Sequence, residues 1–430
     1  MPTVILGGGI IAASIAYCLS EQQQNEEIHV VESSSTLFSS ASGYAAGFIA
    51  KNWFEPSLVP LGELSFAMHG AIAAEHGGDK KWGYMKSTAL SLGSTDASSG
   101  GARGDDWLRS GTSRAETATS KPVVTDGPGW LTSQKQTAIE RISEGDDVAQ
   151  VDPLRLCHFL LEKSRSRGVK LHQPSTATSL IKDSTGTITA VKLLNLDTKV
   201  ESTLPCTNLI LAAGAWTPRV FATLFPASNA IPSIYPLAGY SLVVRSPRYT
   251  PVHEAVASGS QSVFTTLPQG CGFSTELCSR EGAEIYIAGL NSREIPVPER
   301  VEDLKRSFEA KEMQKLKNVT VRLLGKLADG TTESTDQVSN VDDLEILREG
   351  LCLRPVAERG VPFVSRVDDS SLGYGVKSSK NGGVFIAAGH GPWGIALSLG
   401  TGKVVADLVR GVKPAADITG LGIGSSKAKL

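Results

Sequence analysis

Three segments of the chain share one pattern, in which a short apolar run leads through a glycine turn into an apolar helix. They begin near residues 3, 208 and 383, far apart in the sequence. Uninterrupted apolar runs of this kind are typical of strands that are buried on both faces of a parallel sheet. We therefore predict an α/β unit with a Rossmann-like parallel sheet, assembled from distant parts of the chain.

The segments between these three predict a second layer of structure. A helix is expected to follow Val151-Asp152-Pro153, because an aspartate caps a helix that has proline at its first position. Residues 88–130 are rich in Ser, Gly, Thr and Asp, which predicts a long surface excursion with little regular structure. Apolar runs and one charged amphipathic stretch predict strands at 168–171, 177–182, 188–195, 241–245 and 284–289 and a helix at 301–316.

The composition excludes several classes of protein. The formal net charge of −2 leaves no basic excess, so no nucleic acid partner is expected. No apolar run approaches the roughly 18 to 20 residues of a membrane span, and the apolar N-terminus already forms the first strand, so we expect neither a span nor a secretory signal. The six cysteines lack Cys-x-x-Cys spacing and the seven histidines are dispersed, which predicts buried thiols and no metal site.

The first thirty-two residues carry the most specific chemistry. Gly7 permits a tight turn out of the strand, Gly9 lets the backbone approach a pyrophosphate, and Ala12 keeps the helix close to the strand. Glu32 ends the second strand and can accept hydrogen bonds from both ribose hydroxyls, which favours FAD or NAD over NADP. The alternative is a glycine turn that only packs a βαβ unit.

Five motifs together give the chain a family resemblance. It resembles the D-amino-acid oxidase-like (DAO) family of FAD-dependent oxidoreductases, which includes glycine, sarcosine and fructosyl-amino-acid oxidases, and within it fungal FAD-dependent oxidoreductases that share residues 42–48. The motifs are the N-terminal Gly-x-Gly with Glu32, Ala45-Ala46-Gly47, Ala213-Gly214-Ala215-Trp216, Cys352-Leu353-Arg354-Pro355 and Gly389-His390-Gly391.

The resemblance implies FAD as the cofactor and a two-domain fold. The expected fold class is α/β, with a Rossmann-like FAD-binding domain of the GR2 type and an inserted α+β substrate domain built on an antiparallel sheet. We assign residues 1–50, 146–225 and 346–420 to the FAD-binding domain, 51–145 and 226–345 to the substrate domain, and 421–430 to a flexible tail.

The family's cofactor contacts carry over to this chain by position. For Trp216 and Trp393 the alternative is ordinary core packing. The residues implied to contact FAD are Gly7, Gly9, Ile10, Ile11, Glu32, Ser33, Ser42, Ala45, Ala46, Gly47, Phe48, Ala177, Ala213, Gly214, Trp216, Gly391, Trp393, Gly394 and Ile395.

Three further residues are candidates at the reacting end of the site. Arg354 resembles the arginine that family members present to the substrate carboxylate, which a guanidinium binds through two parallel hydrogen bonds; the alternative is a structural arginine paired with Glu358. Tyr240 is predicted to hydrogen-bond the substrate, or else to be an ordinary strand tyrosine. Cys352 stands where some members join a cysteine covalently to the flavin, but its neighbours follow the glycine oxidase pattern, so a buried free thiol and non-covalent FAD are expected, with attachment as the alternative.

The last residues suggest a cellular address. Ala428-Lys429-Leu430 follows a Gly/Ser-rich tail and is a close variant of the Ser-Lys-Leu peroxisomal signal. We therefore expect a peroxisomal import receptor as a partner and a peroxisomal location, with the cytoplasm as the alternative.

Together these features predict an enzyme. We expect an FAD-dependent oxidase of an amino acid or a carboxylate-bearing secondary amine, in which hydride passes from the substrate carbon to flavin N5, giving an imine and, with molecular oxygen, hydrogen peroxide. The alternatives are an FAD-dependent dehydrogenase, a 2-hydroxy acid oxidase, and a non-catalytic flavin-binding regulatory protein.

Overall fold

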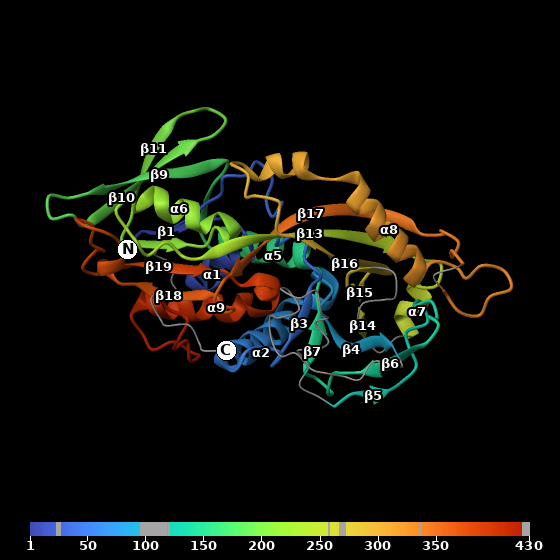
Figure 1. Cartoon of the computed structure of the whole chain (residues 1–430). Coiled ribbons are helices and arrows are strands. Elements are labelled where there is room, and N and C mark those ends of the chain that lie inside the picture. The colour runs from blue at the N-terminus through green and yellow to red at the C-terminus, as the bar shows by residue number, and fades with distance from the viewer. Residues whose placement is uncertain are drawn as a thin grey trace.

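The computed structural model describes residues 1–22, 27–94, 118, 121–256, 259–265, 272–335 and 338–423. It contains two large sheets, which lie side by side in Figure 1. The first has six strands in the order β18 (Phe363–Val367), β19 (Gly383–Ala388), β12 (Asn208–Leu211), β1 (Thr3–Leu6), β2 (Ile28–Val31) and β8 (Lys170–His172). Every pair in it is parallel except β18–β19. The predicted parallel sheet, assembled from distant segments, is confirmed.

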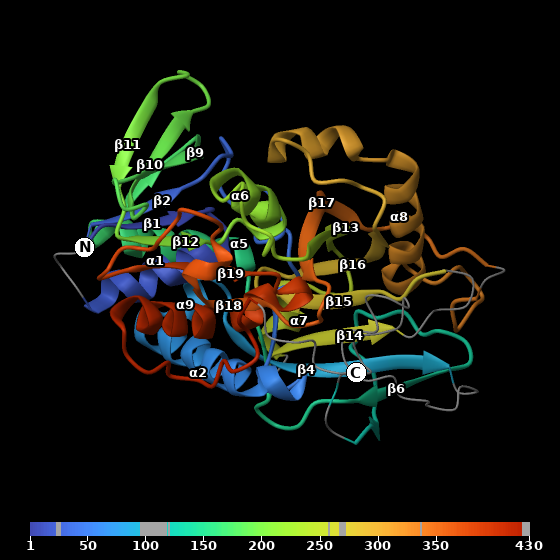
Figure 2. The ribbon, with the colours of Figure 1, turned by 60° about the vertical axis from the view of Figure 1, so that its left-hand side comes forward.

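Both faces of this sheet are covered, as its apolar strands require. Ile5 of β1 faces the helices α1 (Ile10–Gln22), α5 (Pro153–Ser166) and α9 (Gly394–Arg410), whereas Val4 and Leu6 face the opposite side. That side is covered by α6 (Thr217–Leu224) and by a three-stranded antiparallel sheet, which stands up from the molecule in Figure 2. Its strands are β9 (Ser175–Lys182), β10 (Ile188–Asn195) and β11 (Glu201–Pro205).

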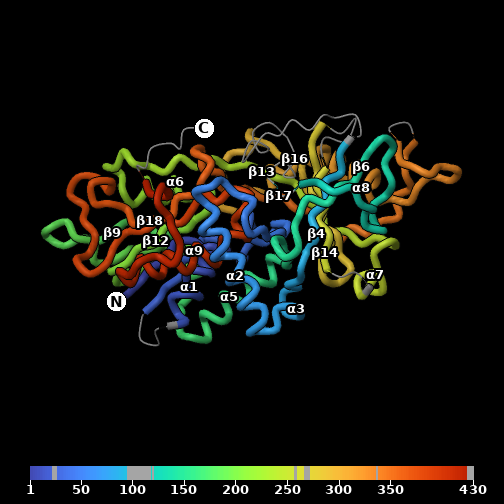
Figure 3. Tube along the Cα trace, turned by 90° about the horizontal axis from the view of Figure 1, so that it is seen from below, coloured from blue at the N-terminus to red at the C-terminus, as the bar shows by residue number. Residues whose placement is uncertain are grey.

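Helix α9 packs between α1 and α2 (Val59–His76), as Figure 3 shows from below. Two glycines permit this close approach. A Cβ on Gly402 would lie 2.6 Å from the carbonyl oxygen of Ser14 in α1, and a Cβ on Gly400 would lie 2.8 Å from that of Leu61 in α2. Larger residues at these positions would push the helices apart.

The second sheet is mainly antiparallel and carries α8 (Ala310–Leu324) against its outer face (Figure 2). Leu316 and Leu323 of α8 belong to the same buried cluster as Leu242 and Ile287 of the sheet. Its strands run in the order β17 (Glu345–Ala357), β13 (Ile234–Arg245), β16 (Glu284–Ser292), β15 (Glu276–Arg280), β14 (Ser260–Thr265), β4 (Met85–Ser94), β6 (Thr137–Arg141) and β5 (Val123–Val124).

Short elements complete the described structure. Strand β3 (Phe48–Ala50) pairs with β7 (Val148–Gln150), which also pairs with β4. Among the described residues, no helix is both long and apolar enough to cross a membrane. The remaining elements are α3 (Gly78–Lys81), α7 (Pro251–Val256) and the 3₁₀ helices Pro56–Leu58, Gly214–Trp216, Val301–Ser307, Asp369–Ser371 and Gly391–Trp393.

Two local predictions need correction. The charged helix expected at 301–316 is instead a 3₁₀ helix, Val301–Ser307, then an extended Phe308, then α8, which continues to Leu324. Residues 88–94, predicted as irregular, belong to β4, where Leu90 and Leu92 are buried in the sheet core. The Ser- and Gly-rich composition concealed this apolar alternation. The rest of that excursion lies largely outside the described residues.

The domain boundaries stay a prediction. Strand β17 begins at the proposed boundary near residue 346 and lies in the antiparallel sheet, while α2, placed in the proposed substrate domain, packs against α9. The division of the strands between the two sheets therefore does not fall at the same residues as the predicted domain boundaries.

Candidate active site

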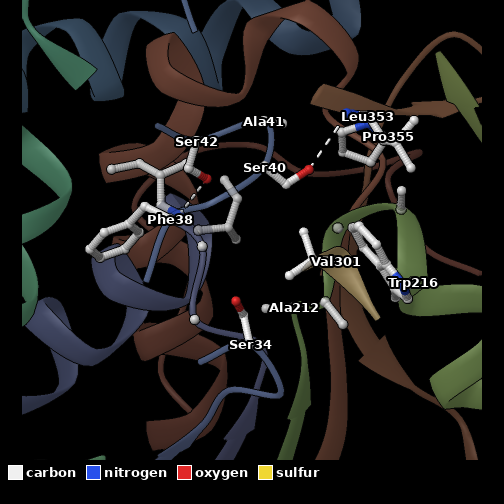
Figure 4. A pocket seen from close by; sticks show the side chains of 18 of the residues that line it. Ser34, Phe38, Ser40, Ala41, Ser42, Ala212, Trp216, Val301, Leu353 and Pro355 are labelled. Atoms are coloured by element: carbon white, nitrogen blue, oxygen red, sulfur yellow. Dashed lines mark hydrogen bonds between the residues drawn. The ribbon is translucent and has the colours of Figure 1, made fainter. Parts of the chain in front are cut away.

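A cavity of about 600 Å³ lies between the two sheets, and part of its wall is drawn in Figure 4. One side is formed by the loops that follow β1, β2, β12 and β19, at the carboxyl edge of the parallel sheet, where ligands of open α/β sheets bind. The other side is formed by strands β15, β16 and β17 of the antiparallel sheet. The volume lies within the range of cofactor and ligand sites.

The glycine turn after β1 is shaped for close approach of a ligand. Gly7 has φ of +112°, and a Cβ there would overlap the carbonyl group of Ala212 at the end of β12. The amide of Ile10, at the start of α1, donates to Ser42 Oγ over 2.9 Å, a bond drawn in Figure 4. The N-terminus of α1 therefore lies in the cavity wall. The partial positive charge at this end of the helix suits a pyrophosphate.

Glu32 closes the other side of this turn. Its carboxylate accepts hydrogen bonds from the amide of Gly8, at 2.6 Å, and from the amide of Ser34, at 2.7 Å. Burial raises the pKa of Glu32, and the two amide bonds oppose that rise. An acid held at the end of β2 in the cavity wall has the position that the ribose hydroxyls of a dinucleotide require.

The small-residue segment after Ser42 is held in place by two buried polar side chains. Arg280 of β15, 3% exposed, donates through Nε to Ala46 O over 3.1 Å and through Nη2 to Ala45 O over 2.5 Å. Gln150 Nε2 donates to Ala46 O over 2.7 Å. These bonds occupy the carbonyls of Ala45 and Ala46, and the same small residues line the cavity, where a planar ring can approach them. Neither Arg280 nor Gln150 was predicted, because each is distant in sequence from the segment it holds.

These features fit FAD. The glycine turn supplies a cradle that any Cβ would fill, the start of α1 supplies phosphate-binding amides, Glu32 supplies the ribose acceptor, and the segment 42–48 supplies the surface for the ring system.

Arg354 lies in the opposite wall. It comes from β17, and its guanidinium crosses the neighbouring strand β13 at Gly239, where a Cβ would overlap it. Arg354 Nη1 donates to Asn291 Oδ1 of β16 over 2.5 Å. Burial opposes its charge, but nearby Cys352, Tyr286 and Glu276 outweigh that effect and raise the pKa of the guanidinium. The partner that the structure gives Arg354 is thus Asn291, whereas the alternative considered above was a loop carboxylate such as Glu358.

Tyr286, Glu276 and Cys352 line the cavity beside Arg354. The hydroxyl of Tyr286 donates to Tyr44 O over 3.1 Å, and burial raises its pKa. Cys352 is 4% exposed, and burial raises the pKa of its thiol, so the neutral form is favoured. Tyr286 and Glu276 were not predicted as site residues, since nothing in their local sequence differs from an ordinary strand.

Two predicted site residues point away from the cavity. Tyr240 follows Gly239 on β13 and therefore faces the other side of the sheet, where its ring packs against Phe308 and its hydroxyl accepts from the amide of Glu309 over 3.1 Å. Trp393 is 3% exposed and packs against Phe54, with ring centroids 4.9 Å apart. The structure thus gives Tyr240 the alternative of an ordinary strand tyrosine and Trp393 that of core packing.

All the other predicted site residues lie in the cavity wall. Trp216 also donates from Nε1 to Pro298 O over 2.8 Å. The wall contains Gly7, Gly9, Ile10, Ile11, Glu32, Ser33, Ser42, Ala45, Ala46, Gly47, Phe48, Ala177, Ala213, Gly214, Trp216, Cys352, Arg354, Gly391, Gly394 and Ile395. The terminal Ala428-Lys429-Leu430 lies outside the described residues.

Comparison with known proteins gives consistent matches over nearly the whole chain. A glycine oxidase of Geobacillus kaustophilus is 25% identical over 430 residues, covering 96% of this chain and 94% of that protein. An oxidoreductase of Schizosaccharomyces pombe is 24% identical over 427 residues, covering 94% and 93%. The crystal structure of the Geobacillus kaustophilus glycine oxidase has the same fold, with a TM-score of 0.66 at 22% identity and 99% and 98% coverage.

An iminodiacetate oxidase from Chelativorans sp. BNC1 also shares the fold, with a TM-score of 0.66 at 16% identity and 98% coverage of both chains. The model of the DAO family, described as FAD dependent oxidoreductase, matches residues 3–408. FAD is therefore the cofactor that the cavity fits, and the expected mixed α/β fold of the family is confirmed. The chain belongs to the DAO family of FAD-dependent oxidoreductases.

Proposed function

We propose that this enzyme is an oxidase of an amino acid or of a carboxylate-bearing secondary amine. The observation that carries the proposal is the guanidinium of Arg354, which lines the cavity and is oriented by Asn291. A half-buried arginine in the wall of a cofactor-sized cavity calls for an anionic ligand, and its planar fork matches a carboxylate. Two relatives, a glycine oxidase and an iminodiacetate oxidase, are named for a primary and a secondary amine that each carry a carboxylate.

The protein's own part in this reaction is to hold and orient. Bound FAD supplies the acceptor at N5 for the hydride that leaves the carbon next to the amine, and molecular oxygen then takes up the electrons as hydrogen peroxide. The turn at Gly7 and the carboxylate of Glu32 hold the nucleotide, and Arg354 fixes the substrate carboxylate. Because no proton is removed from carbon in this scheme, a strong base at the carbon is not needed.

The test is anaerobic mixing of the purified holoenzyme with D- and L-amino acids, glycine, sarcosine, other N-methyl and fructosyl amino acids, and 2-hydroxy acids. The proposal predicts that an amine substrate bleaches the visible flavin absorbance and that air restores it with formation of peroxide. Slow reoxidation by air would instead indicate a dehydrogenase, and bleaching by lactate or glycolate alone a 2-hydroxy acid oxidase. No bleaching by any compound would favour the non-catalytic flavoprotein.

We also propose a peroxisomal location, supported by the terminal Ala428-Lys429-Leu430 and by the peroxide that the reaction would release. A fluorescent protein fused in front of residues 421–430 tests this directly. Import that is lost when the last three residues are removed supports an import receptor as partner, whereas cytoplasmic fluorescence of the intact fusion contradicts it.

A further inference from the structure

Glu276 is a buried carboxylate in the cavity wall with no role in the scheme above. It begins β15, is 8% exposed, and belongs to the same lining as Arg354. On one side it pairs in the sheet with Phe264 of β14 and on the other with Ala288 of β16.

The groups around Glu276 place it beside the substrate end of the cavity. Among the described residues, the charge of Glu276 acts on Tyr286 of β16 and on Cys352 and Arg354 of β17. The guanidinium of Arg354 reaches Asn291 on β16, the strand next to β15. The same wall of the cavity therefore carries a cation and an anion.

This pair of charges is complementary to a zwitterion. A ligand whose carboxylate lies on Arg354 has its ammonium group a short distance further along the same molecule, and Glu276 offers the opposite charge. A ligand with a carboxylate alone meets the attraction of Arg354 together with the repulsion of Glu276. The wall thus discriminates between an amino acid and the corresponding simple acid.

We propose that Glu276 binds the substrate ammonium group, so that a ligand carrying both charges is held between Arg354 and Glu276. The proposal rests on the function proposed above and extends it by naming the group that faces the amine.

The first test is ligand binding to the FAD-loaded protein, followed by the change in the visible flavin spectrum under anaerobic conditions. Glycine and acetate are the probes, because they share a carboxylate and differ in the ammonium group. Glu276→Gln is expected to weaken glycine binding roughly 10- to 100-fold, the value of a charge-assisted contact, and to tighten acetate binding. Equal weakening of both ligands would show that Glu276 only supports Arg354, and unchanged binding of both would also overturn the proposal.

The matched control is Glu284→Gln, which removes a carboxylate from the adjoining strand β16 at a site that faces Arg245 rather than the cavity. It is expected to change neither affinity. If Glu276→Gln does not fold, Glu276→Asp is the test variant. Its shorter side chain moves the carboxylate away from the ammonium group, so it is expected to lower glycine affinity more than acetate affinity. Equal losses in that variant would contradict the proposal.

The second test is the substrate dependence of flavin reduction by a compound found in the panel. In Glu276→Gln half-saturation is expected at a roughly 10- to 100-fold higher substrate concentration. An unchanged half-saturation concentration overturns the binding role. If no panel compound reduces the wild-type flavin, the proposed function fails, while the glycine and acetate titrations still decide the role of Glu276 in binding.

Discussion

The two walls of the cavity recognise their ligands in different ways. The nucleotide wall consists mainly of backbone amides, glycines and small side chains. Among its described residues, Glu32 is the one charged side chain that accepts hydrogen bonds from backbone amides. The opposite wall works through long side chains, Arg354, Tyr286 and Glu276, which come from three strands. The first wall tolerates almost no change of backbone, whereas the second can be altered one side chain at a time. Cofactor binding and substrate choice should therefore be separable by mutation.

The largest expected effect is on the nucleotide wall. Gly7→Ala places a Cβ against the carbonyl group of Ala212 at a φ of +112°, and neither backbone can move without disturbing β1 or β12. A strain of about 3 kcal/mol corresponds to a loss of roughly 100-fold in FAD affinity. The purified variant should be nearly colourless, as its absorbance spectrum will show.

The control is Gly129→Ala, at a site where a Cβ meets open space. It should retain the flavin content of the wild type. A fully yellow Gly7→Ala protein would show that the turn does not require glycine for FAD binding.

The next effect belongs to the opposite wall. Gly239→Ala puts a Cβ where the Arg354 guanidinium now lies, and the flexible side chain must move away from Asn291. Acetate binding should weaken by roughly 10-fold, the equivalent of about 1.4 kcal/mol, while FAD content stays unchanged. Gly93→Ala in β4 of the same sheet, where a Cβ meets no atom, is the control. Loss of FAD together with acetate would show that the walls are not separable.

A smaller effect concerns the segment 297–302, which joins the two walls. Glu302 accepts from the amide of Ser35 at 2.7 Å and from Ser34 Oγ at 3.1 Å, and Val301 beside it lines the cavity, as Figure 4 shows. Partial burial works against ionisation, but these hydrogen bonds lower the pKa of Glu302 from 4.5 to about 2.

Because the folded-state pKa is lowered, the stabilisation by Glu302 is complete above about pH 4.5 and is lost as the pH falls through 2. Release of FAD, followed by flavin fluorescence, should accelerate a few-fold over that window in the wild type. In Glu302→Gln release should be faster above pH 4.5 and should lack this part of the pH dependence. Parallel profiles for the two proteins would show that Glu302 does not hold the segment.

The smallest effect is expected for Trp216→Phe, which removes the hydrogen bond to Pro298 O and keeps most of the ring. One such bond, at the low end of the usual range, contributes about 0.5 kcal/mol, or roughly twofold in the rate of FAD release. Arg219 still holds the same carbonyl through Nη1. A larger change in release rate than that caused by Glu302→Gln would show that Trp216, rather than Glu302, is the stronger tether of this segment.

The nucleotide wall could be predicted from the sequence because its determinants are local. Gly7, Gly9, Ala12 and Glu32 lie in one βαβ unit, and their spacing follows from the dinucleotide itself. Three strands of the parallel sheet, β1, β12 and β19, were predictable for the same reason, since each leads into a glycine turn.

The substrate wall could be predicted only in part, because strand register decides which side chains share it. Arg354 was found by family resemblance, but Tyr286 and Glu276 reach the wall through the pairing of β15, β16 and β13. Tyr240 was misplaced because the face of β13 that looks into the cavity is fixed by Gly239, one residue away, and a shift of one residue reverses the side chain. The prediction for Trp393 was wrong for a related reason. Its neighbours Pro392 and Gly394 line the cavity, whereas its own ring packs in the core.

Binding of the substrate carboxylate by Arg354 is tested most sharply by Arg354→Met in the FAD-loaded protein, titrated with acetate and mixed anaerobically with the substrate found for the wild type. We expect full flavin content, a loss of acetate binding of at least roughly 30-fold, since about 2 kcal/mol of charge-assisted contact is removed, and flavin reduction that is slowed to a similar extent. Unchanged acetate binding with unchanged flavin reduction would show that the substrate carboxylate does not bind Arg354.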